Sequence, residues 1–432
     1  MVQNKTAWKH GAARAVKAIF AVLGALTIVF FAFFGGEFST LKTLNRVEDD
    51  ANLFTMEYKA DYALDRFLKI GASTDTELIE FIVRQVLKGI PLKFDLPNLG
   101  CSTFAAKLAD GTPIFGRNFD MYDSPALLVT TRPKDGYASI SMVNLAYIGY
   151  NSENLPTSLA KGIMTLAAPY APLDGVNEKG LAVGVLQIKT TPTNQQTDKV
   201  DITTTSAIRL LLDRAATVEE AIELLSQYDM HASANSCYHF HIADANGGSV
   251  IVEYIDDEMS VVQDDAATNF LLTPGEYDFG KGEDRYATLR ETLDANGGIF
   301  ENKIYPNVKE TLALLKEKGF VLCTASSKPQ VYVKQILEYF DIDKYFDYVG
   351  GATLDGKISR KEDVINRVIS DNGFSPDEIL MVGDRKYDLT GAEKMKIDAV
   401  GVLYGFGSYK ELSTEKSVAL IDNIKQLTDI LK

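Results

Sequence analysis

Residues 98–104 read Asn-Leu-Gly-Cys-Ser-Thr-Phe, and residues 113–120, after a short connection, read Pro-Ile-Phe-Gly-Arg-Asn-Phe-Asp. Residue types alternate from the first stretch onward and again along the second, which predicts two strands, and the Asp-Gly pair between them favours a tight hairpin. Such a hairpin would bring Arg117 beside Cys101. Because a neighbouring cation lowers the pKa of a thiol and holds the thiolate, the pattern predicts a nucleophilic cysteine at the head of the hairpin.

Together with Asp120, this motif resembles the start of the linear amide C-N hydrolases, the family of choloylglycine (bile salt) hydrolases, penicillin V acylases and acid ceramidase-like enzymes. Three later motifs follow in the family's order: Asn-Glu-Lys-Gly-Leu at 177–181, Thr-Asn at 268–269 and Asp-Arg-Tyr at 284–286. The resemblance implies an N-terminal nucleophile (Ntn) hydrolase, an αββα sandwich over residues 101–299, and no cofactor. The catalytic residues that it implies are Cys101, Arg117, Asp120, Asn177, Asn269 and Arg285.

By this resemblance the chain is cut between Gly100 and Cys101, when the thiol attacks the preceding carbonyl and the thioester is hydrolysed. The freed α-amino group has a reference pKa of about 7.7–8.0, so it can accept the thiol proton near neutral pH. Asp120 would hold this amine, and Arg117 would favour the thiolate.

The remaining implied roles concern the tetrahedral intermediate. Asn177 and Asn269 would donate hydrogen bonds to its oxyanion, and Arg285 would complete the polar network or bind the polar end of the acyl substrate. An asparagine before Glu-Lys-Gly is also typical of a turn, which is the alternative for Asn177. His239 and His241 lie two apart on an expected strand without a completing metal-ligand pattern, which favours sheet residues over a metal site.

The N-terminal region has the composition of a membrane anchor. Residues 1–17 carry a basic flank, and residues 18–36 form an uncharged apolar run close to the length that a membrane-spanning helix needs. The basic flank should remain in the cytoplasm, which places the catalytic part outside. A cleaved signal peptide is the alternative. Residues 37–100 are expected to form a helical propeptide or stalk, and cleavage before Cys101 would release the enzyme from it.

Residues 302–432 alternate strand and helix patterns, which predicts a parallel sheet with its site at the carboxyl ends of the strands. This part resembles the phosphoglycolate phosphatase branch of the haloacid dehalogenase (HAD) superfamily. The resemblance implies that Ser326 and Lys361 bind phosphate and that Asp384 and Asp388 bind Mg²⁺. The domain is expected to span residues 300–432.

The HAD-like part lacks the superfamily's Asp-x-Asp-Gly-Thr nucleophile motif. The Asp-x-Asp at 341–343 lies between an expected helix and strand, and Asp110 belongs to the hairpin turn. Without an aspartyl nucleophile no aspartyl-phosphate can form. The amidase part also lacks the strands expected after the helix near Arg285, and lost strands leave unpaired sheet edges. The chain therefore resembles two truncated domains, joined either by a natural fusion or by a rearranged gene.

Composition restricts the function further. The chain of 432 residues carries a net charge of −15, which argues against a nucleic-acid partner, and its three cysteines are too few for a zinc site or a disulfide framework. We expect a membrane-anchored, self-processing cysteine amidase that hydrolyses an N-acyl amino acid or N-acyl amine of the conjugated bile salt, penicillin V or acylethanolamine type. The alternatives are a HAD-like phosphohydrolase and a catalytically inactive membrane-anchored fusion.

Overall fold

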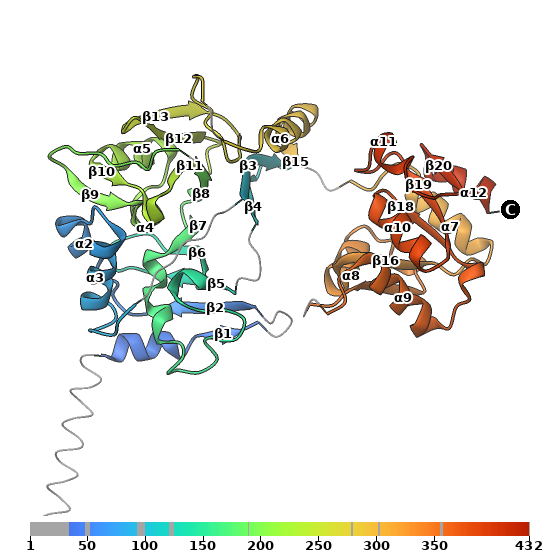
Figure 1. Ribbon diagram of the computed structural model, residues 1–432, viewed down its shortest axis with the longest axis horizontal. Coiled ribbons are helices and arrows are strands. Elements are labelled where there is room, and N and C mark those ends of the chain that lie inside the picture. Colours follow the sequence, from blue (N-terminus) through green and yellow to red (C-terminus); the bar gives the residue numbers. More distant parts are fainter. Residues whose placement is uncertain are drawn as a thin grey trace, which may run out of the picture. The chain divides into compact units, whose positions relative to one another are not determined.

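The computed structural model describes the chain in eight segments: residues 34–47, 52–92, 100–120, 125–188, 190–277, 280–300, 303–354 and 357–431. The described residues up to 300 form one compact unit and those from 303 form a second (Figure 1). The expected membrane helix at 18–36 lies outside the described residues, apart from its last three. Within the part of the chain that the structure describes, no helix combines the length and the apolar character needed to cross a bilayer.

A nine-stranded sheet forms the centre of the first unit (Figure 1). Its strands, in spatial order, are β1 (Asn45–Arg46), β2 (Leu53–Tyr58), β5 (Ala126–Thr131), β6 (Ser139–Asn144), β7 (Pro172–Asn177), β8 (Ala182–Ile188), β11 (Cys237–Ala243), β12 (Ser249–Ile255) and β13 (Glu258–Gln263). Every neighbouring pair is antiparallel except β2 and β5. All residues of β8 and β11 are buried, which indicates that both faces of the sheet are covered.

Helices and a second sheet cover those two faces. Helices α4 (Thr204–Arg214) and α5 (Val218–Ser226) contact β7, β8, β11 and β12. The second sheet meets β8 through β3 (Gly100–Leu108), and helix α6 (Glu283–Ala295) packs on the second sheet. The order of layers is therefore helix, sheet, sheet, helix. A small parallel pair, β9 (Val200–Thr203) and β10 (Tyr228–His231), flanks α4 and α5.

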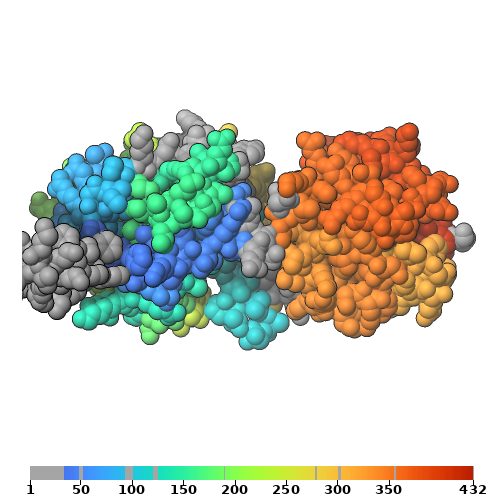
Figure 2. Space-filling model, turned by 90° about the horizontal axis from the view of Figure 1, so that it is seen from below, coloured from blue at the N-terminus to red at the C-terminus, as the bar shows by residue number. Residues whose placement is uncertain are grey.

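The second sheet is built on the expected hairpin. Strand β3 pairs along its length with β4 (Pro113–Asp120), and Cys101 stands opposite Phe119. On its other edge β3 meets β14 (Ala266–Ala267) and β15 (Ile299–Phe300). No described strand pairs with the outer edge of β4. The hairpin tip forms a protruding cyan lobe in Figure 2.

Residues 37–100 differ from the helical propeptide or stalk expected from the sequence. They include helices α2 (Leu64–Ile70) and α3 (Asp75–Gln85), but they also supply β1 and β2 to the large sheet. Alternate residues of β2, namely Phe54, Met56 and Tyr58, are buried in the main core. This strand is held by its pairing with β5, which is distant in sequence. The helical spacing of apolar residues further along the segment gives no sign of this strand.

The second unit alternates strands and helices as expected, but its strands form two parallel sheets in place of one. Its elements are α7 (Val308–Glu317), β16 (Cys323–Pro329), α8 (Gln330–Tyr339), β17 (Tyr348–Ala352), α9 (Lys361–Asn372), β18 (Leu380–Gly383), α10 (Lys386–Lys394), β19 (Asp398–Val402), α11 (Tyr409–Leu412), β20 (Ala419–Ile421) and α12 (Leu427–Ile430). One sheet contains β16 and β17, and the other contains β18, β19 and β20.

An apolar cavity of about 400 Å³ lies between the two sheets. Its lining includes Cys323 and Ala325 of β16 and Met381 of β18, together with Ile365 of α9 and Leu315 of α7. The cavity is therefore bounded by one strand from each sheet and by helices. No described strand lies between β16 and β18, so their facing edges are not joined by a ladder of hydrogen bonds.

Candidate active site

Cys101 lies at the start of β3 between the two sheets of the first unit. It is fully buried and packs with Leu186, Ile251 and Ala267. Its thiol faces Arg117, whose Nη2 is 3.8 Å from Sγ. The register of the hairpin produces this contact. Arg117 stands opposite Thr103, which lies two residues after Cys101 and therefore on the same face of β3.

Arg117 is fixed by the large sheet. Its Nη1 donates to the carbonyl oxygen of Leu173 at 2.5 Å, and its Nη2 donates to that of Val185 at 2.8 Å. Its Nε lies 3.2 Å from Oδ2 of Asp174, a charge contact that lacks hydrogen-bond alignment. Burial raises the pKa of Asp174, and the charge of Arg117 opposes that rise. The guanidinium therefore has little freedom to leave the thiol.

The main chain of Cys101 is held by Asn269 and Arg285, the two expected site residues that are farthest from it along the chain. Asn269 Oδ1 accepts the Cys101 N–H at 2.8 Å, and Arg285 Nη1 donates to the Cys101 carbonyl oxygen at 2.5 Å. Arg285 Nη2 also donates to Asn269 Oδ1 at 2.8 Å, and Asn269 Nδ2 donates to the Gln187 carbonyl oxygen at 2.8 Å. In this arrangement Asn269 directs its oxygen, not its amide donors, toward Cys101.

Two tyrosines that the sequence analysis did not identify lie near this cluster. Burial raises the pKa of Tyr147, the charges of Tyr238 and Cys101 add to the rise, and Arg117 opposes it. Burial likewise raises the pKa of Tyr238, with further contributions from Asp75 and Cys101. Both phenols therefore stay protonated beside the thiol. No local motif marks them, because they follow β6 and lie in β11, far from the hairpin in sequence.

Asn177 has a different environment from the one implied by the resemblance. Its Nδ2 donates to the carbonyl oxygens of Leu212 and Ala215, and its Oδ1 accepts the N–H groups of Lys179 and Leu181. These bonds close the turn between β7 and β8 and fix it to the end of α4. None of them involves the Cys101 cluster, so the structure favours the turn alternative.

Asp120 is placed only through its main chain. It ends β4 and pairs with Gly100, the residue before the nucleophile, while its side chain lies outside the described residues. The hairpin thus brings Asp120 beside the bond expected to be cut. Its role in holding the amine stays a prediction.

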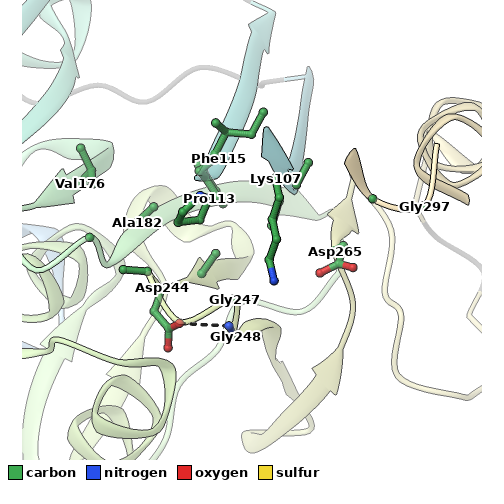
Figure 3. A pocket seen from close by; sticks show the side chains of 17 residues that line it. Lys107, Pro113, Phe115, Val176, Ala182, Asp244, Gly247, Gly248, Asp265 and Gly297 are labelled. Carbon is green, nitrogen blue, oxygen red and sulfur yellow. Dashed lines mark hydrogen bonds between the residues drawn. The ribbon is translucent and has the colours of Figure 1, made fainter. Parts of the chain in front are cut away.

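Two hollows lie beside the hairpin and share Phe115, Val176 and Ala182. The first, about 360 Å³, contains the Lys107 ammonium and is bordered by Asp244, whose carboxylate accepts the N–H groups of a tight turn (Figure 3). The second, about 330 Å³, is lined by Arg117 and Asp174 and by several apolar side chains of the large sheet, which are Leu128, Ile140 and Met142. In the second hollow, apolar side chains and the Arg117 guanidinium line the same space.

The four residues expected at the HAD-like site lie around the ends of β16 and β18. Lys361 Nζ lies 2.9 Å from Asp388 Oδ1 and donates to the Ala325 carbonyl oxygen at 2.7 Å, next to Ser326. Asp384 Oδ2 accepts the Phe406 N–H at 2.8 Å. These residues are therefore gathered at the carboxyl ends of parallel strands, as expected.

The same residues fit Mg²⁺ poorly. HAD-like domains generally use this ion, but both oxygens of Asp388 are engaged, one by Lys361 and the other by the Arg385 N–H. Among the described residues no group of three acidic, histidine or cysteine side chains could hold a metal. Among the described residues that line the cavity between β16 and β18, the carboxylate is that of Glu378, which precedes β18 and so lies at the end of that strand opposite to Asp384. We therefore derive no metal-dependent step for this unit.

Comparisons with known proteins match the chain to two families, whose matched ranges overlap at residues 263–279. Residues 101–279 match the family model "Linear amide C-N hydrolases, choloylglycine hydrolase family", and residues 263–402 match "Haloacid dehalogenase-like hydrolase". A conjugated bile acid hydrolase from Clostridium perfringens is a structural neighbour, with 18% identity, a TM-score of 0.30, and coverage of 47% of this chain and 60% of that one.

The other similarities concern the HAD-like part. A "5'-nucleotidase" from Pseudomonas aeruginosa is 33% identical over 135 residues, which cover 31% of this chain and 61% of the relative. A "Phosphoglycolate phosphatase" from Vibrio parahaemolyticus is 31% identical over 153 residues, covering 34% and 67%. A "predicted phosphatase" from Clostridium acetobutylicum has 43% identity, a TM-score of 0.30 and coverage of 34% and 68%. This chain spans about three fifths of the length of the first curated relatives.

Proposed function

The chain joins a domain of the linear amide C-N hydrolases, in the choloylglycine hydrolase family, to a haloacid dehalogenase-like domain, and we propose that the first is a self-processing cysteine amidase. Both are hydrolase families. The proposal depends on one observation above all: the thiol of Cys101 lies beside Arg117 while Asn269 and Arg285 hold its main-chain nitrogen and oxygen. A nucleophile held at both ends of its residue is pre-organised for attack.

The proposed reaction uses residues of the first unit alone. The Cys101 thiolate attacks the Gly100 carbonyl carbon, the peptide nitrogen leaves as the new α-amine, and water hydrolyses the thioester. In each later turnover that amine accepts the thiol proton, and the thiolate attacks the amide carbon of the substrate. Arg117 favours the thiolate, and Asn269 positions the amine through the contact that it makes with the Cys101 nitrogen.

The substrate class that we propose is a linear N-acyl amide, either an N-acyl amino acid or an N-acyl amine. Conjugated bile salts, penicillin V and acylethanolamines contain this bond. The apolar hollow beside Arg117, lined by Leu128, Ile140 and Met142, offers a surface for the acyl group. Its burial would supply binding energy in proportion to the apolar area removed from water.

The test is the intact mass and N-terminal sequence of the purified protein, combined with amine release from a panel of N-acyl amides. We expect a new terminus that begins Cys-Ser-Thr-Phe, and its loss together with turnover in Cys101→Ala. Cys237→Ala is the matched control, because Cys237 is equally buried but lies in another cluster. A single uncut chain in folded wild-type protein would contradict the proposal.

The subcellular location is a separate proposal. We propose that residues 18–36 anchor the protein in a membrane with the catalytic part outside the cytoplasm, and that after cleavage before Cys101 residues 1–100 stay bound to the catalytic part through the pairing of β2 with β5. Fractionation of cells that express wild type or Cys101→Ala tests this. Recovery of the uncut variant in the soluble fraction would contradict the anchor.

A further inference from the structure

A buried ion pair lies beneath the segment that carries Asn269. His239 of β11 and Glu253 of β12 are fully buried, and His239 Nδ1 lies 3.0 Å from Glu253 Oε1. The carboxylate also accepts the N–H groups of Leu272 and Thr273, each at 2.8 Å. Glu253 therefore binds the main chain just after Asn269, at residues 272 and 273.

His239 lies between two hydrogen-bond partners. Its Nε2 lies 2.7 Å from the main-chain oxygen of Thr268, which can only accept a hydrogen bond. Its Nδ1 faces Glu253. Burial alone would raise the pKa of Glu253, but hydrogen bonds and charge from His239 and the donors at 272 and 273 bring that pKa below its usual value, so the carboxyl is ionised. Both ring nitrogens of His239 therefore face acceptors, the Glu253 carboxylate and the Thr268 oxygen.

This ion pair is connected to the nucleophile through one residue. Thr268, which accepts from His239, directly precedes Asn269, whose Oδ1 accepts the Cys101 N–H at 2.8 Å. Residues 272 and 273, which donate to Glu253, follow Asn269 closely. The segment that carries Asn269 is thus fixed on both sides by a single buried pair.

We propose that His239 and Glu253 are positioning residues for the nucleophile, since they fix the segment 268–273 so that Asn269 holds the nitrogen of Cys101. This inference rests on the proposed amidase function, in which that nitrogen becomes the catalytic base. The pair does not touch the reacting atoms. It acts through Asn269, and its loss should move the base relative to the thiol.

His241 provides an internal comparison. It lies two residues along the same strand and is fully buried, but its partners are the hydroxyls of Thr103, at 2.8 Å from Nδ1, and Ser249, at 2.9 Å from Nε2. Burial and the charge of His239 lower the pKa of His241 to about 3, so this ring is neutral. His241 joins the same two sheets as His239 without a contact to the Asn269 segment.

The experiment compares His239→Gln with His241→Gln, first in Cys101→Ala protein, which stays uncut. The readout is hydrogen exchange at the amide of residue 101, the donor to Asn269. We expect H239Q to accelerate this exchange at least 10-fold and H241Q to leave it within about 2-fold, because only H239Q releases Asn269. In protein that retains Cys101, we expect H239Q to lower kcat about 100-fold with KM nearly unchanged, as a displacement of about 1 Å can cause.

The outcomes are distinguishable from failure of the amidase proposal. Exchange at residue 101 needs no turnover, so an inactive wild type combined with H239Q-specific exchange would reject the amidase and retain the positioning. Equal exchange, or an equal loss of kcat, in the two variants would overturn the positioning. If H239Q does not fold, Glu253→Gln takes its place, since it keeps the side-chain shape and removes the charge that orients the ring. An unchanged exchange rate in E253Q would then overturn the inference.

Discussion

In the first unit the second sheet ends at β4, whereas in the second unit the gap lies in the middle, between β16 and β18. Cys101, the proposed nucleophile of the first unit, is on β3, which keeps partners on both edges, and it is enclosed by the hairpin and the large sheet. In the second unit the gap is an apolar cavity. It lies where a strand carrying the nucleophile would have to stand beside the four expected site residues. A strand missing at an edge leaves a site intact, but one missing at the centre does not.

The most severe test of this comparison is Arg117→Met. The variant removes the cation beside Cys101 and leaves Asp174 partly buried without its charge partner. We expect kcat to fall about 10²- to 10³-fold, as with the loss of a key electrostatic group, and the free energy of unfolding to fall by about 3 kcal/mol. Amine release and urea unfolding measure the two effects.

Arg290→Met is the control for that variant. Arg290 also pairs with carboxylates, those of Asp264 and Asp294, but it is about one third exposed and far from the thiol in the hydrogen-bond network. Its loss should cost no more than about 1 kcal/mol and leave kcat unchanged. Equal effects of the two substitutions would show that Arg117 is only structural.

A smaller effect, confined to the second unit, is expected for Lys361→Met. The ammonium contacts Asp388 and the Ala325 carbonyl in a site that is largely buried. Its removal leaves an uncompensated carboxylate, which should destabilise this unit by about 3 kcal/mol. Amide hydrolysis should not change, because the proposed chemistry lies wholly in the first unit. Hydrogen exchange of peptides from the second unit measures the loss.

Lys394→Met is the matched control, since Lys394 pairs with Glu362 at 2.8 Å across the same two helices but is half exposed. Such a pair contributes at most about 1 kcal/mol. A separate test concerns phosphatase activity of the second unit. Magnesium-dependent phosphate release from p-nitrophenyl phosphate that is lost in Asp384→Ala would show that the site of the second unit is complete despite the gap, and would contradict the comparison. We expect none above the blank.

The smallest expected effect is a difference in acid sensitivity. The lowered pKa of Glu253 in the folded state means that its ionisation adds stability above the unfolded-state pKa of about 4.3, and that this stability is lost as the pH falls through the folded value. Glu253→Gln should therefore flatten the pH dependence of unfolding of the first unit below about pH 4.3.

The second unit offers an exposed counterpart for the same measurement. Hydrogen bonds and charge from Lys344 and Lys309 lower the pKa of Asp341 to about 2, but the group is fully exposed and water screens its pairs. Asp341→Asn should scarcely alter the acid unfolding of its unit. A larger acid effect from Asp341 than from Glu253 would contradict the expectation that a buried carboxylate contributes more to stability than an exposed one.

Most single elements could be predicted from the sequence, because their patterns are local. The expected hairpin is confirmed as β3 and β4, and the expected helix and strand alternation is confirmed from α7 to β18, with bounds that differ by a few residues. Strand β2 was not predicted, although Phe54, Met56 and Tyr58 recur in it with the period of a strand; its pairing with the distant β5 is seen only in the structure. The absent Asp-x-Asp-Gly-Thr motif already indicated that the second domain is truncated, but only the structure shows the cavity between β16 and β18.

At the site, the contact between Cys101 and Arg117 follows from the local sequence, since a hairpin fixes the register of its own two strands. Which distant residues join them depends on how the strands and layers are arranged. The order of strands in the large sheet brings Asp174 and Tyr238 to the site, the packing of one sheet on the other places His239 beneath Asn269, and the turn between β7 and β8 engages Asn177. Neighbours along the chain encode a hairpin, but contacts between strands far apart in sequence depend on sheet order and on how the layers pack.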